Sequence, residues 1–200
     1  SVLGVFILQA IGLFIATNID DIIVLSLFFA RGAGRSGTAA KIIAGQYLGF
    51  GAILAAAIIL ALGARSFLPE SFIPYFGLIP LALGLRAAWQ SWRGQDDDDD
   101  DEQATGKPIS VMTVAAVTFA NGGDNIGVYV PIFITVGTMG IIAYSGVFLL
   151  LVVGLVLVAR YVATRKSIAA ILERWEHVLF PLVLISLGTF ILVEGGAFGL

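Results

Sequence analysis

The sequence predicts an all-α integral membrane protein with six transmembrane helices, arranged as two inverted three-helix repeats. Composition is the first reason: 58% of the 200 residues are hydrophobic and 12% are charged, against about 25% charged residues in a soluble domain. A series of long apolar segments and a weak internal repeat are the other two. This composition excludes a soluble enzyme and a nucleic-acid-binding protein, and the absence of cysteine excludes a disulfide scaffold and a thiolate metal site.

Six apolar segments follow one another along the chain. Four of them have an ordinary length, because about 20 residues at a rise of about 1.5 Å cross a hydrocarbon core of about 30 Å. The first and the fourth are longer and carry polar residues halfway along, so we expect helices one and four to be interrupted by polar motifs at mid-membrane. The predicted spans are Val2–Ala30, Ala39–Gly63, Phe72–Trp92, Ser110–Gly137, Ile141–Ala159 and Val178–Val193.

Basic residues predict the orientation in the membrane. With six spans, the loops and helix ends after the first, third and fifth lie on one side, and they contain all but one of the 11 Lys and Arg residues, the exception being Arg65. Because cytoplasmic loops carry the excess of Lys and Arg, this side is predicted to be cytoplasmic. We therefore expect the protein to lie in the plasma (inner) membrane, with both termini outside the cytoplasm. The residues concerned are Arg31, Arg35, Lys41, Arg86, Arg93, Lys107, Arg160, Arg165, Lys166 and Arg174.

The two halves of the chain resemble each other. A shift of 104 residues places Asp20–Asp21 on Asp124–Asn125, and the same shift aligns Leu83–Gly84 with Leu187–Gly188. Three spans per repeat is an odd number, so the second copy must enter the membrane upside down. Inverted repeats of this kind are typical of secondary transporters, whose binding site lies between the copies near the bilayer midplane.

This repeat divides the chain into three parts. Residues 1–92 form the first three-helix repeat and residues 110–200 the second. Residues 93–109 form an acidic cytoplasmic linker, which contains the acidic run Asp96–Glu102. A block of like charges cannot fold against itself, so we expect the linker to be a solvated tether. The alternative is a cytoplasmic funnel that concentrates cations by its charge.

Three carboxylates lie near the middle of predicted spans, namely Asp20, Asp21 and Asp124. An ionised Asp at the centre of a membrane helix costs about 2.5–3.5 kcal/mol on the insertion scale. The sequence has no Lys, Arg or His at comparable depth in any span. Protons or a bound cation are therefore the expected partners, and we expect Asp20 or Asp21 to converge with Asp124 on one cavity.

The residues around these carboxylates also carry oxygen ligands. Asn18 and Thr17 precede Asp21 by three and four residues, so all three fall on one face of a helix. Carboxylate, amide and carbonyl oxygens suit hard divalent cations. The sequence therefore predicts a metal site and no catalytic residues, with the cation as a transported substrate and no resident cofactor. The predicted metal ligands are Thr17, Asn18, Asp20, Asp21, Asn121, Asp124 and Asn125.

Two motifs resemble those of the cadmium-resistance transporter family, within the lysine-exporter superfamily of small 3+3 membrane exporters. They are Ala-Thr-Asn-Ile-Asp-Asp at 16–21 and Asn-Gly-Gly-Asp-Asn-Ile-Gly-Val-Tyr at 121–129. The resemblance implies efflux of a divalent cation along a path lined by both motifs. The positions that match are Asp20, Asp21, Asn121, Asp124 and Asn125. The metal stays open among cadmium, manganese, zinc, calcium and magnesium, because an oxygen-only site has no preference for a soft ion.

Metal and protons compete for the same carboxylate oxygens, so the predicted mechanism is export of the cation in exchange for protons. The expected partners are a divalent cation, protons and the lipid bilayer, without nucleic acid, and a homo-oligomer is left open. Two alternatives remain: an exporter of an amino acid or small organic cation, and an intramembrane aspartyl protease. The protease pattern Gly-x-Gly-Asp is not met, since Asn121 occupies its first glycine position, so we expect a protein that is not an enzyme.

Overall fold

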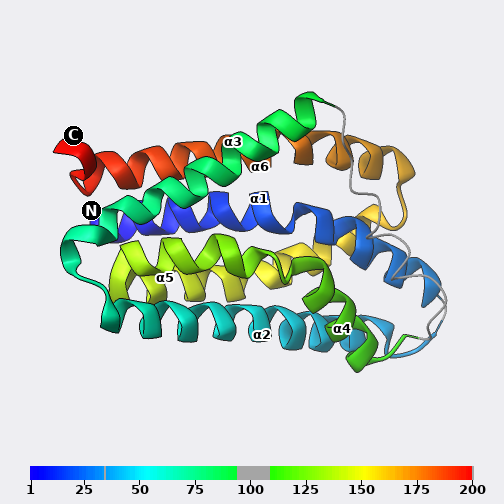
Figure 1. The fold of residues 1–200 in the computed structure, drawn as a ribbon. Helices are drawn as coiled ribbons and strands as arrows, with labels where there is room; N and C mark the ends of the chain where they lie inside the picture. Colours follow the sequence, from blue (N-terminus) through cyan, green and yellow to red (C-terminus); the bar gives the residue numbers. More distant parts are fainter. Residues whose placement is uncertain (34, 94–108, 200) are drawn as a thin grey trace.

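The computed structural model describes residues 1–33, 35–93 and 109–199. In these ranges the chain forms α-helices and short 3₁₀ segments, with no β-strand. The predicted linker 93–109 and its acidic run lie almost wholly outside the described residues. Figure 1 shows the helices, which are α1 (Val2–Arg31), α2 (Thr38–Phe67), the 3₁₀ segment η1 (Glu70–Gly77), α3 (Leu78–Trp92), α4 (Val111–Gly122), α5 (Asn125–Val162), α6 (Lys166–Glu194) and the 3₁₀ turn η3 (Ala197–Gly199).

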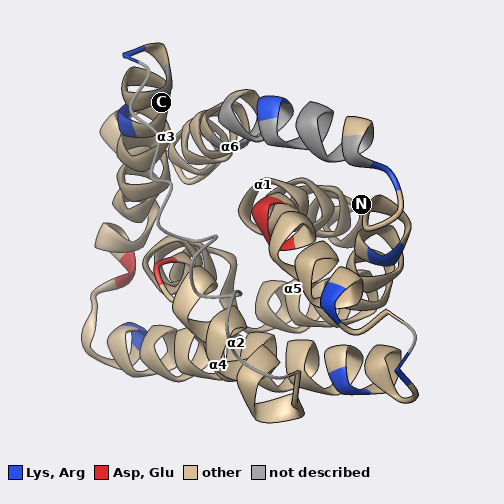
Figure 2. Ribbon diagram, turned by 90° about the vertical axis from the view of Figure 1, so that its right-hand side faces the viewer, with Lys and Arg blue, Asp and Glu red and all other residues tan. Residues whose placement is uncertain are grey.

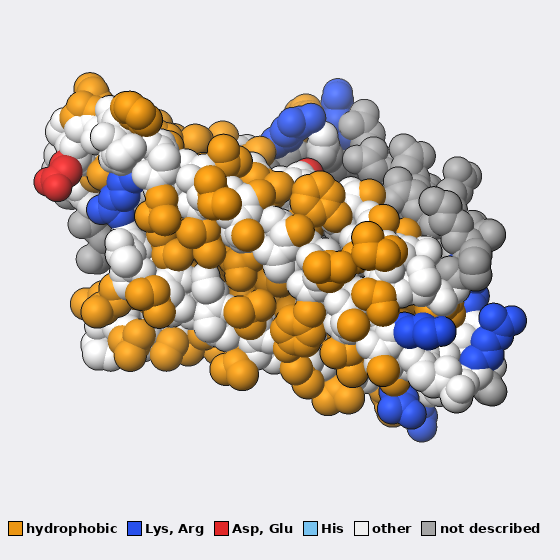
Figure 3. Space-filling view, turned by 90° about the horizontal axis from the view of Figure 1, so that it is seen from below, with side chains coloured by type: hydrophobic (Ala, Val, Ile, Leu, Met, Phe, Trp, Pro, Cys, Tyr) orange, Lys and Arg blue, Asp and Glu red, His pale blue; other side chains and the backbone are white. Residues whose placement is uncertain are grey.

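Several of these helices can cross a membrane by length and composition. Four are long and apolar enough, namely α1, α2, the segment Glu70–Gln90 and α5, and two shorter apolar helices lie at Val111–Gly122 and Pro181–Val193. Large apolar side chains cover much of the outer surface (Figure 3), and Leu8 and Leu150 are 73% and 75% exposed. An all-helical chain with an apolar exterior is a multi-pass membrane protein.

The first predicted span is a single unbroken helix, so the expected interruption of helix one is wrong. α1 passes through the whole polar motif without a break. The Thr17 hydroxyl donates to the Leu13 carbonyl at 2.8 Å, and the Asn18 amide donates to the Phe14 carbonyl at 3.1 Å. Such side-chain bonds to the preceding turn satisfy polar groups within the helix, so the motif does not require unwound backbone.

The fourth predicted span is interrupted, as expected, where the sequence has two successive glycines. α4 ends at Gly122 and α5 begins at Asn125. Between them the Ile126 amide donates to the Gly123 carbonyl, three residues back, at 3.2 Å. This 3₁₀-type bond replaces the usual bond to a carbonyl four residues back, and α5 continues at an angle to α4 (Figure 1).

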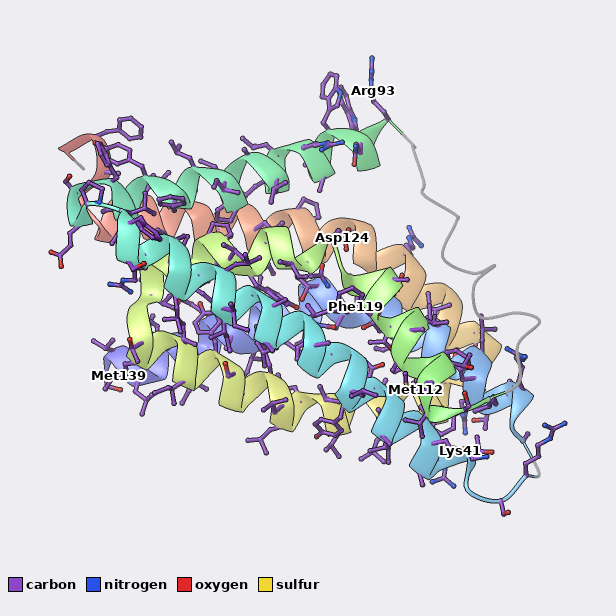
Figure 4. All side chains as sticks on the ribbon, turned by 60° about the horizontal axis from the view of Figure 1, so that its bottom comes forward. Lys41, Arg93, Met112, Phe119, Asp124 and Met139 are labelled. Carbon is purple, nitrogen blue, oxygen red and sulfur yellow. The ribbon has the colours of Figure 1, made fainter. Side chains whose placement is uncertain are left out.

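A sharp reversal divides α5 into two antiparallel parts. At Gly137 the backbone has φ 74° and ψ −174°, a conformation open to glycine and strained for other residues. The parts before and after this residue run in opposite directions (Figure 4). α5 therefore contains the end of the fourth predicted span and all of the fifth, and the predicted boundary at Gly137 lies where the structure has its turn.

Glycines allow α2 to pack closely on α4. A Cβ atom on Gly45 would lie 2.5 Å from the Cβ of Val114, and one on Gly49 would lie 2.7 Å from the Ala115 carbonyl oxygen. Real Cβ atoms do not approach so closely. The two backbones are therefore as near as small residues permit, which is a common way to pack helices in membranes.

α3 and α6 form a second close pair with reciprocal contacts. A Cβ atom on Gly84 would lie 2.8 Å from the Ile185 amide nitrogen, and one on Gly188 would lie 2.5 Å from the Leu81 amide nitrogen. The 104-residue shift exchanges Gly84 with Gly188 and Leu81 with Ile185. Under this shift each contact corresponds to the other.

This packing predicts that Gly188→Leu destabilises the protein, by about 1–3 kcal/mol if the helices can shift and by more if they cannot. The added side chain meets the α3 backbone, so α6 must move away from α3. Thermal unfolding of the purified protein in detergent measures the effect. Gly146→Leu is the matched control, because a Cβ atom there meets nothing within 4 Å. Equal unfolding temperatures for the two variants would contradict the packing account.

Charge divides the ends of the bundle. Lys and Arg side chains gather toward the end of the molecule where α1 finishes and α2 begins (Figure 3). The N- and C-termini lie together at the opposite end (Figure 1). Apart from Arg65, which lies at the end of the termini, the basic residues that the structure describes lie toward the other end of the bundle.

Candidate cation site

α1 supplies one half of the site. Thr17, Asn18 and Asp21 are 4%, 1% and 4% exposed, and their spacing of three and four residues aligns them on the face of α1 that points into the bundle. The expectation that these three residues share one helical face is therefore confirmed. Viewed end-on, the acidic stretch of α1 lies within the ring of helices and not on its outer rim (Figure 2).

α4 and α5 supply the other half through two asparagines. The Asn121 side-chain amide donates to the Asp21 carboxylate, and the Asn125 side-chain amide donates to the Thr17 backbone carbonyl at 3.1 Å. The 104-residue shift places Thr17 on Asn121 and Asp21 on Asn125. Under this shift the two contacts are reciprocal.

Tyr129 closes the polar cluster on one side, and the sequence analysis did not select it as a site residue. It is fully buried. Its hydroxyl lies 2.6 Å from the Thr17 hydroxyl and accepts from the Asn18 amide at 3.2 Å. The spacing Asn121, Asn125, Tyr129 repeats every four residues, and this helical period could have identified Tyr129 as a member of the same face.

The remaining two carboxylates are less buried than Asp21. Asp20 is partly buried and accepts from the Asp21 backbone amide at 3.1 Å. Asp124 is exposed and lies at the junction of α4 and α5 (Figure 4). Within the described part of the chain, no three Asp, Glu or His side chains are close enough to hold one metal ion. The structure thus unites Thr17, Asn18, Asp21, Asn121 and Asn125, and it does not bring the three aspartates together.

A continuous α1 explains this separation. Consecutive residues on a helix point about 100° apart, so Asp20 and Asp21 cannot aim at one point unless the helix is broken. α1 is not broken, and the Asp21 carboxylate accepts from the Asn121 side-chain amide. The expectation that Asp20 or Asp21 converges with Asp124 on one cavity stays a prediction.

The chemistry of the cluster favours a hard cation. A buried carboxylate acts on charges in a medium of low dielectric constant, so its attraction for a cation is far stronger than in water. Beside it, the Asn121 side-chain oxygen is buried and has no hydrogen-bond partner among the described residues. Carboxylate, amide and hydroxyl oxygens are ligands that hard divalent cations prefer. The oxygen groups of the cluster therefore match the ligand preference of such an ion.

A bundle of apolar helices with a buried carboxylate–amide cluster at its centre is typical of a membrane transport protein. The family model described as cadmium resistance transporter matches residues 14–200. The chain belongs to this family, and the resemblance seen in the two motifs is confirmed. No curated protein and no solved structure matches the chain. The family is one of transporters, in agreement with the expectation that the protein is not an enzyme.

Proposed function

We propose that the protein exports a divalent metal cation in exchange for protons, through a site formed by Asp21 with Asn121 and Asn125. One observation carries the proposal: the buried Asp21–Asn121 contact is matched by the repeat-related Asn125–Thr17 contact. The cluster therefore lies where the two halves of the chain meet. Family membership supplies the metal cation as the class of substrate.

An architecture of six spans in two inverted repeats, which we propose for the chain, suits such a transport cycle. α1, α2, the segment η1–α3, α4 with the first part of α5, the second part of α5, and α6 correspond in order to the six predicted spans. The reciprocal glycine contacts of α3 and α6 agree with the same two-fold axis as the site contacts. Two related bundles can then rock against each other around a fixed central site, so that the site opens to one side at a time.

The basic end of the bundle is proposed to face the cytoplasm of the cell. Lys and Arg are enriched on the cytoplasmic side of membrane proteins, and the termini lie at the opposite end (Figure 1). Both termini are then outside the cytoplasm in the plasma membrane. Efflux carries the cation from the basic end toward the end that contains Arg65.

Competition between metal and protons supplies the coupling. A divalent cation binds deprotonated carboxylates, whereas burial in a medium of low dielectric constant favours the neutral, protonated form. Release of metal and binding of protons at Asp21 are therefore linked. Asp20 and Asp124, which lie at repeat-related positions, are proposed to take part when the helices move, as further ligands or as proton carriers.

Protection from thermal unfolding tests this function against the two alternatives. A ligand that binds only the folded protein at about 100 times its Kd stabilises it by about 2.7 kcal/mol. We expect Cd²⁺ or Mn²⁺ to raise the unfolding temperature of the detergent-purified protein, and lysine or an aspartyl-protease inhibitor to leave it unchanged. Stabilisation by lysine alone would favour the organic-cation exporter, and stabilisation by the inhibitor alone would favour the protease.

A further inference from the structure

Gln46 on α2 is a buried polar residue that the central cluster does not use. It is fully buried, and the Thr118 hydroxyl of α4 donates to its side-chain oxygen at 2.7 Å. Its side-chain nitrogen is buried and has no hydrogen-bond partner among the described residues. A buried polar atom without a partner is costly and rare in folded proteins. An apolar side chain at this position would avoid that cost, so the amide requires a functional explanation.

Polar side chains continue from Gln46 to the central cluster. Thr118 and Asn121 are three residues apart on α4, so they are neighbours on one face of the helix. Asn121 in turn donates to Asp21, and its own side-chain oxygen is the second buried atom here without a partner among the described residues. Gln46, Thr118 and Asn121 therefore form a line of uncharged polar groups that ends at the buried carboxylate.

The polar line of Gln46, Thr118 and Asn121 runs along the face of α4 that points into the bundle, on the side of the cluster toward the start of α4. Thr118 precedes Asn121 in a helix that begins at the basic, cytoplasmic end, so Thr118 lies between that end and Asp21. The outer face of α4 carries Met112 and Phe119, which are 68% and 43% exposed and point away from the bundle (Figure 4). α2 packs closely on α4 at Gly45 and Gly49, and Gln46 and Thr118 are buried between the two helices, away from the lipid.

We propose that Gln46, Thr118 and Asn121 form a cytoplasmic entry step, a transient binding position that a divalent cation occupies before it reaches Asp21. This inference rests on the proposed function. Rotation of the Gln46 amide by half a turn exchanges its nitrogen and oxygen, two atoms of nearly the same size. Gln46 then presents an oxygen to the cation, while the Thr118 hydroxyl, both donor and acceptor, keeps a hydrogen bond. Uncharged ligands hold the ion less strongly than a carboxylate, as a step on a path requires.

Transport and binding measured separately test the entry step. We expect Gln46→Leu to lower the initial rate of Cd²⁺ transport from the cytoplasmic side of proteoliposomes by about tenfold or more. Tenfold is about the smallest effect seen when a residue that supports a metal ligand is removed. The equilibrium affinity for Cd²⁺ should not change, because Asp21 is intact. Tyr47→Phe is the matched control: it removes the neighbouring hydrogen bond of 2.7 Å to the Leu149 carbonyl and should transport at the wild-type rate.

The two proposals fail in different ways in this experiment. A wild-type protein that neither binds nor transports Cd²⁺ contradicts the proposed function, and the entry step falls with it. An active wild type together with a Gln46→Leu variant of the same rate contradicts the entry step alone. A Gln46→Leu variant that loses rate and affinity equally also contradicts the entry step, because the residue then belongs to the central site.

Cysteine accessibility supplies a second test that does not depend on the rate of transport. The chain contains no cysteine, so one introduced thiol reports on one position. Thr118 is buried in this structure, so Thr118→Cys should react with a membrane-impermeant cationic thiol reagent applied from the cytoplasmic side when the transport cycle opens the site to that side. Phe119→Cys, the next residue but on the exposed outer face, should not react with it. A folded Thr118→Cys variant that is unreactive from the cytoplasmic side would overturn the entry step.

Discussion

Asp21→Asn is expected to abolish cation transport and to leave the protein folded. Asparagine fills the same space and can still accept a hydrogen bond from Asn121, but it lacks the charge that binds the cation. The loss should exceed the roughly 10–100-fold effect of removing a partner that only supports a metal ligand. Initial rates of Cd²⁺ flux in proteoliposomes measure transport, and thermal unfolding without metal confirms that the variant is folded.

Glu70→Gln makes the same chemical change outside the site. Glu70 is exposed in η1 at the end of the bundle opposite the basic residues, so this variant should transport at the wild-type rate. Asp124→Asn should abolish transport as Asp21→Asn does, because Asp124 belongs to the second motif. A fully active Asp21→Asn variant would show that the buried cluster is structural and does not bind the transported ion.

Opposite movement of metal and protons is the second large effect that we expect. In sealed proteoliposomes with an internal pH indicator, each influx of Cd²⁺ should be accompanied by an efflux of protons. If the cation displaces one proton, its equilibrium affinity should fall by about tenfold when the pH drops by one unit. Each further displaced proton adds another factor of about ten. Stability contributed by bound metal is therefore present at high pH and lost as the pH falls.

The coupling has its own control. In Asp21→Asn both fluxes should disappear, while the passive proton leak of the vesicles stays the same. Cd²⁺ flux with no proton movement, and with an affinity independent of pH, would leave the binding site in place and refute exchange with protons.

Much of the site followed from the spacing of polar residues. Thr17, Asn18 and Asp21 were predicted on one helical face because three- and four-residue spacings place side chains together whatever the rest of the fold. The break after Gly122 was predictable because successive glycines weaken a helix. These features depend on local geometry, which a sequence contains.

Other features depend on contacts between distant segments. The continuity of α1 could not be derived from the sequence. It depends on Thr17 and Asn18 bonding to carbonyls of their own helix, and the sequence fits an unwound segment equally well. The hydrogen bond between Asn121 and Asp21 depends on how α4 packs against α1, which the sequence does not reveal. The different directions of Asp20 and Asp21 follow from the continuity of α1.

The location of the bound cation tests the central claim most directly. Crystals of the protein grown with Cd²⁺ and measured near the cadmium absorption edge would show the ion in an anomalous difference map. We predict a Cd²⁺ peak between α1, α4 and α5, coordinated by the Asp21 carboxylate and by a side-chain oxygen of Asn121 or Asn125, and no such peak in Asp21→Asn. A peak elsewhere among the membrane helices, present equally in the wild type and in Asp21→Asn, would contradict the account.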